Sequence, residues 1–79
     1  MPIVQTFMQV RESGGRADDL LKRLQAELWG EASVGVEDDA IPVIFSINRP
    51  PERQHARVRE MLDRLDPDWE DVLAVTGPG

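Results

Sequence analysis

Two stretches of the chain repeat apolar residues at the spacing of an α-helix. Leucines recur every three or four positions between Arg16 and Trp29, and a second apolar stripe follows between Pro51 and Leu65. The first helix should end near Gly30, a residue suited to the turn after a helix. The second opens on prolines, which fit a first helical turn because their missing N–H would be unpaired there. The stripe residues that we predict to be buried include Leu24 and Leu62.

Other stretches favour strands. Ile3–Val10 is rich in β-branched and aromatic residues and contains no breaker, and Ile41–Asn48 is the second strong strand. Trp69–Thr76 predicts a last strand. Ser33–Glu37 alternates loosely, as an edge strand does, and is weakened by Gly35.

The order of these elements predicts the fold. With Ser33–Glu37 as a strand the order is β-α-β-β-α-β, the ferredoxin-like arrangement, and without it the order is β-α-β-α-β. Right-handed crossovers place both helices on the same face of the sheet. We therefore predict an α+β fold, a two-layer α/β sandwich with two helices on one face of a four-stranded sheet. Residues 1–76 form one domain and residues 77–79 a flexible tail.

The sheet face without helices is the predicted interface. In the first strand we assign the row containing Thr6 and Met8 to the core, so that the other row, with Phe7, faces away. In Ile41–Asn48 we assign the even-numbered residues to the uncovered face, which places Phe7 and Phe45 on opposite faces. The predicted interface residues are Ile3, Gln5, Phe7, Gln9, Ile44 and Ser46.

Apolar side chains on an uncovered face favour association. The function predicted from this pattern is a small non-enzymatic interaction module that binds itself, as a homodimer, or another protein. A small-ligand regulatory domain is a further alternative, based on analogy of fold alone.

The composition of the chain excludes or disfavours several classes of partner and site. The 79 residues include 15 acidic and nine basic ones, for a net charge of −6, which disfavours nucleic acid. The absence of cysteine excludes disulfides, thiolate metal sites and thiol catalysis. We expect a cytoplasmic protein without a membrane span, because no apolar run is long enough and no leader follows Met1. Arginine is strongly favoured over lysine, which suggests a GC-rich bacterium or its phage.

Few residues suggest a binding or catalytic site. Arg49, Arg53 and Arg57 fall near one side of the second helix and are the candidate anion contacts, with a solvated charged face as the alternative. The single histidine, His55, has no second ligand or catalytic partner at a suitable spacing, so we expect a half-buried structural role. We therefore predict no catalytic group, no metal and no cofactor. We expect Trp29 and Trp69 to pack at helix ends.

The opening residues Met1-Pro2-Ile3-Val4-Gln5 provide an enzymatic alternative. They resemble the start of the 4-oxalocrotonate tautomerase family, in which the initiator methionine is removed and the N-terminal proline acts as a general base. The resemblance covers these five residues and a shared β-α-β order, and the chain departs from the family after that. It implies Pro2 as the base and Arg11 or Arg16 as the group that binds a substrate carboxylate.

Overall fold

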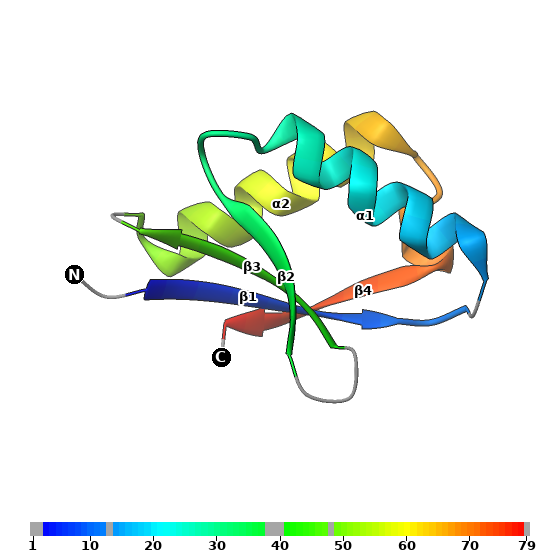
Figure 1. Cartoon of the computed structure of the whole chain (residues 1–79), viewed down its shortest axis with the longest axis horizontal. Helices are drawn as coiled ribbons and strands as arrows, with labels where there is room; N and C mark the ends of the chain where they lie inside the picture. The colour runs from blue at the N-terminus through cyan, green and yellow to red at the C-terminus, as the bar shows by residue number, and fades with distance from the viewer. Residues whose placement is uncertain (1–2, 13, 38–40, 48, 79) are drawn as a thin grey trace.

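A four-stranded antiparallel sheet carries both helices on one face (Figure 1). The computed structural model describes residues 3–12, 14–37, 41–47 and 49–78. The strand order β2-β3-β1-β4 confirms the predicted ferredoxin-like fold. The elements follow along the chain as β1 (Ile3–Val10), α1 (Gly15–Glu27), β2 (Ser33–Glu37), β3 (Ile41–Ile47), α2 (Pro51–Leu65), the 3-10 helix η2 (Trp69–Asp71) and β4 (Leu73–Pro78).

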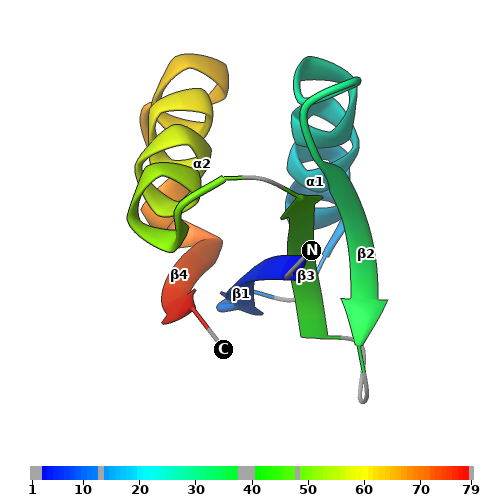
Figure 2. The same ribbon diagram turned by 90° about the vertical axis from the view of Figure 1, so that its left-hand side faces the viewer.

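The core lies between the helices and the sheet. Leu24 of α1 and Leu62 of α2 are fully buried, as their stripes predict. From the sheet, Met8, Ile44 and Leu73 join the same cluster. Figure 2 shows the two helices side by side above the strands, with the opposite face of the sheet left without a helix.

The segment after α2 differs from the prediction. Trp69 does not begin a strand: it opens η2, in which the Asp71 N–H donates to Asp68 O at 3.0 Å and the Val72 N–H to Trp69 O at 3.0 Å. The Trp69 ring is buried, and its Nε1–H donates to Asp63 Oδ1 at 2.6 Å. This contact holds the tryptophan under α2, so the strand begins only at Leu73.

The C-terminal end of the chain also differs from the prediction. Gly77 and Pro78, which we expected in the tail, extend β4 and pair with Phe7 and Thr6 of β1. Gly79 and Asn48 lie outside the described residues.

The turn after α1 decides the position of Trp29. The N–H groups of Glu31 and Ala32 both donate to Leu28 O at 2.9 Å, and Gly30 adopts a φ of 85°, in the left-handed region that favours glycine. Leu28 is buried, whereas Trp29 is 82% exposed. The prediction that Trp29 packs at a helix end is therefore wrong, because the helix places Leu28 toward the sheet and the next residue outside.

Candidate functional site

The face of the sheet opposite the helices, called the open face below, is formed by alternate residues of paired strands. On β1 these are Ile3, Gln5, Phe7 and Gln9, as predicted, because Thr6 and Met8 are buried under the helices. Antiparallel pairing sets Phe7 opposite Val43 and Gln5 opposite Phe45. Directly opposite residues share a face, so Val43 and Phe45 also belong to the open face.

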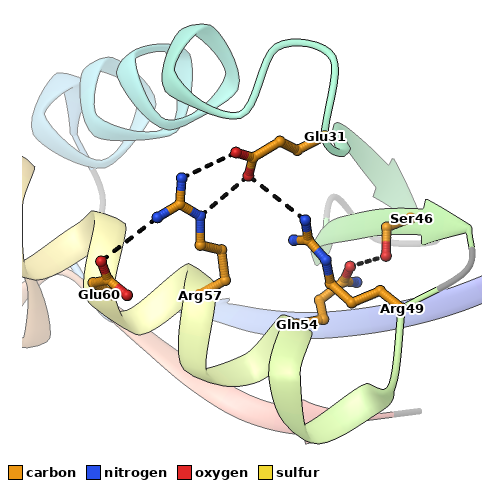
Figure 3. Close-up of polar contacts among 6 residues, drawn as sticks. All are labelled: Glu31, Ser46, Arg49, Gln54, Arg57 and Glu60. Atoms are coloured by element: carbon orange, nitrogen blue, oxygen red, sulfur yellow. Dashed lines mark hydrogen bonds and ion pairs between the residues drawn. The ribbon is translucent and has the colours of Figure 1, made fainter.

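This register corrects the assignment of β3. Ile44 and Ser46, which we expected on the open face, are 0% and 5% exposed and point toward the helices. Ile44 lies opposite the buried Thr6, and the Ser46 hydroxyl donates to Gln54 Oε1 of α2 (Figure 3). They are core residues, and Phe7 and Phe45 lie on the same face of the sheet.

A glutamine fixes this packing. Gln54 is fully buried, and its Nε2 donates to Val4 O and to Ile44 O, each at 3.0 Å. Through these bonds α2 is tied to both central strands, β1 and β3. A buried amide with all these partners stabilises one relative position of helix and sheet, since leaving any of the groups unpaired is costly.

The open face carries an apolar cluster of its own. Ile3 is 64% exposed and Ile41 42% exposed, and Phe7 and Phe45 are half-buried. Val43 is fully buried although no helix covers it. Its neighbours on this face are Phe7, on β1, and Phe45, two residues along β3. We call Ile3, Phe7, Ile41, Val43 and Phe45 the open-face cluster.

Gly35 makes room for this cluster. A Cβ at Gly35 would lie 2.6 Å from Cε2 of Phe45, so the aromatic ring occupies the space above the glycine. An aromatic side chain that covers a glycine on a neighbouring strand compensates for the missing side chain there. Gly35, which the sequence indicates only as a weakness of the strand, therefore positions Phe45 against the sheet.

The centre of the open face is uncharged where its side chains are described. Beside the apolar cluster, β1 contributes the amides of Gln5 and Gln9. Ser33 pairs with Phe45, and Ala74 with Gln9. None of these side chains ionises, although 30% of the chain is charged. The register sets one acidic residue on this face, Glu37, opposite Ile41 at the end of the edge strand β2. The centre of the face, around Phe7 and Val43, is without charge among the described side chains.

The predicted anion contacts meet a carboxylate of the chain itself (Figure 3). Arg57 donates from Nε and Nη2 to the two carboxylate oxygens of Glu31, at 3.1 and 3.0 Å, and the Arg49 Nη2 lies 3.8 Å from Glu31 Oε2. The hydrogen bond from Arg57 lowers the pKa of Glu31 below its ordinary value. Arg53 is exposed and is not brought to this carboxylate. The arrangement ties α2 to the turn after α1 and favours an internal structural role for Arg49 and Arg57.

A hollow beside these ion pairs bears on the small-ligand alternative. Its volume is about 510 Å³, and residues 30–33 line it together with Ile3, Phe45 and Ser46. Two of its polar groups are already engaged, Glu31 by arginine and Ser46 by Gln54. The hollow therefore offers few free polar groups to orient a ligand.

Of the residues implied by the tautomerase resemblance, the structure describes Arg11 and Arg16. Pro2 lies outside the described residues, and its neighbour Ile3 opens β1, whereas Arg11 follows the other end of this eight-residue strand. At about 3.3 Å per residue the strand separates its ends by more than about 20 Å. Arg11 donates to Glu70 O at 3.0 Å and Arg16 to Asp66 Oδ2 at 3.1 Å. Both arginines are thus engaged by residues that follow α2, at the end of β1 opposite to Ile3.

His55 is half-buried, on the side of α2 that faces β1. Its Nδ1 lies 3.2 Å from Thr6 Oγ1, and its Nε2 is buried without a hydrogen-bond partner among the described residues. Burial lowers the pKa of His55, and the nearby Arg59 lowers it further. The neutral imidazole is thus the form that fits this position.

We expect the domain to lose stability as the pH falls below about 6.5, the ordinary pKa of histidine. The unfolded chain takes up a proton on His55 there, whereas the folded chain resists it, so the free energy of unfolding decreases as the pH falls. Urea titrations at pH 7.5 and 5.5 should show this loss in the wild type and a smaller one in His55→Gln. The acidic groups with lowered pKa values, Glu31 and Asp66, change stability only at lower pH. Equal losses in both proteins would contradict the assignment.

No group of three or more metal-ligating side chains is found in the part of the chain that the structure describes. Over the same part, no helix is long and apolar enough to cross a membrane. Comparisons of the chain with models of protein families, with curated proteins and with solved structures found no match.

Proposed function

We propose that this chain is a non-enzymatic protein-interaction module that binds its partner through the open face, in the cytoplasm. The supporting observation is the open-face cluster: two half-buried phenylalanines and two exposed isoleucines on a sheet face without a helix. Apolar side chains gathered on one face typically mark a contact surface. The uncharged side chains around the cluster favour a contact that excludes water at its centre.

A nucleic-acid partner is the second candidate, since Phe7 and Phe45 lie on the same face of neighbouring central strands. RNA-recognition domains stack bases on aromatic residues of a four-stranded sheet. Such domains also need basic groups for the phosphates, and no lysine or arginine is among the described side chains of the open face. The net charge of −6 adds to this disadvantage. Protein is therefore the favoured partner.

Photo-crosslinking distinguishes these partners. A p-benzoylphenylalanine in place of Phe7 would sit in the open face, and one in place of Gln25, exposed on α1, serves as the control. Irradiation of cells expressing each variant should give protein adducts at position 7 that are missing at position 25. Adducts to RNA at position 7 would replace our proposal by the nucleic-acid candidate. An absence of adducts specific to position 7 would overturn it.

A further inference from the structure

We infer that the occupant of the open face is a second copy of this chain, apposed through a twofold axis near Phe7. This inference rests on the proposed function and specifies its partner. Phe7 is the fifth residue of the eight-residue β1, and β1 is one of the two central strands. A contact centred there uses the same patch on both copies, as a closed dimer requires.

The polar side chains of the open face can form hydrogen bonds with the same side chains of a second copy. Gln5 and Gln9 lie two positions before and after Phe7 on the same row. An amide side chain both donates and accepts hydrogen bonds, so a glutamine can pair with a glutamine of the second copy. Carboxylates or ammonium groups at the centre of the face would instead repel the same groups of the second copy.

The charge distribution also favours this contact. Each copy carries a net charge of −6, so two copies repel one another at long range. The described side chains at the centre of the open face carry no charge, and Glu37 lies only at the end of the edge strand β2. Two such molecules can therefore approach through the centre of this face without like charges in the contact. Added salt screens the long-range repulsion and should strengthen the dimer. The same salt would instead weaken the binding of a basic protein or of a nucleic acid.

The area of the open face indicates how tightly two copies would bind. Four strands at a spacing of about 4.8 Å, each about six residues long, give a flat area of about 400 Å². Two apposed faces then cover about 800 Å², which is below the range of stable interfaces and typical of weak, reversible ones. We therefore expect a monomer at a few micromolar and a growing dimer fraction at about 100 µM and above.

Sedimentation equilibrium tests the inference with a matched pair of variants. Gln5→Glu adds one negative charge to the open face with almost no change in shape, and Gln25→Glu adds the same charge on the exposed side of α1. The wild type should dimerise more tightly in about 300 mM than in about 20 mM NaCl. Gln5→Glu should weaken the dimer at least about tenfold, because a charge would be buried without a partner. Gln25→Glu should stay within about twofold of the wild type.

The outcomes separate this inference from the proposed function. A wild type that is monomeric at about 500 µM, but forms adducts to another protein at position 7, overturns the dimer and leaves the proposed function standing. A dimer that Gln5→Glu and Gln25→Glu affect equally is formed elsewhere, which overturns the inference. A dimer that weakens with added salt also overturns it. Circular dichroism of both variants verifies that they are folded.

Discussion

Truncating Leu62 to alanine should lower the free energy of unfolding by about 2–5 kcal/mol, because Leu62 is fully buried between α2 and the sheet. The loss combines the transfer of the side chain with the cavity left among its neighbours. Leu24, on α1, should behave in the same way. A domain of this size is stabilised by roughly 4–12 kcal/mol in total, so either change removes a large share of it. Urea denaturation followed by circular dichroism measures the effect.

Leu21→Ala is the control for this cavity effect. Leu21 is half-buried and packs only at the margin of the core, so its truncation leaves a partly open space that water and neighbouring side chains can fill. We expect a loss of about 1 kcal/mol there. Equal unfolding midpoints for Leu62→Ala and Leu21→Ala would show that the α2 stripe does not form the centre of the core.

Replacing Gln54 by leucine should cost about 3 kcal/mol, although leucine is the more apolar side chain. The change removes the donor to Val4 O and Ile44 O and the acceptor of the Ser46 hydroxyl, all in a place closed to water. Buried polar groups that lose their partners retain the cost of dehydration without the hydrogen bond. Thermal and urea unfolding of the variant measure the loss.

A second substitution isolates the part due to Ser46. In the background of Gln54→Leu, Ser46→Ala removes the hydroxyl that has lost its acceptor and should recover about 1 kcal/mol. In the wild type the same Ser46→Ala change should destabilise, because it leaves Gln54 Oε1 without its donor. If Ser46→Ala had the same effect in both backgrounds, the two side chains would not be coupled. If Gln54→Leu matched the wild type, the buried amide would not hold α2 on the sheet.

The arrangement of helices and strands could be read from the sequence. The leucine stripes have the helical period and are bounded by Gly30 and by Pro50, Pro51 and Pro67, so the helices lie close to their predicted limits. Ile3–Val10 and Ser33–Glu37 match β1 and β2 at both ends. The handedness of the crossovers then leaves one arrangement, with both helices on the same face of the sheet.

The core-facing row of β1 could also be predicted, because its two rows differ. Thr6 and Met8 alternate with Gln5 and Gln9, and the amides mark the side that faces away. The open face as a feature, with Ile3 and Phe7 on it, follows from this alternation. The interaction partner of that face remains a prediction.

In β3 the same argument fails, because both rows are apolar. Val43 and Phe45 make one row apolar, and Ile44 makes the other row apolar as well. Ser46 is the one polar residue among these four, and we interpreted it as a sign of exposure. Ser46 is buried because Gln54, eight residues later on α2, accepts its hydrogen bond. A hydrophobic pattern records how many apolar residues a strand has, and it cannot show which buried partner a polar one will meet.

Hydrophobic periodicity and turn residues, which act locally, thus determined the elements, their order and the core-facing rows of the helices and of β1. Only the tertiary structure decided the face of β3, the room that Gly35 gives to the Phe45 ring, and the start of β4 at Leu73 after the contact of Trp69 with Asp63. Each of these depends on the register of one strand against another or on a contact between residues of different elements. Register and such contacts are fixed only when the helices pack on the sheet. Until then the local pattern is compatible with either row of β3 facing the helices.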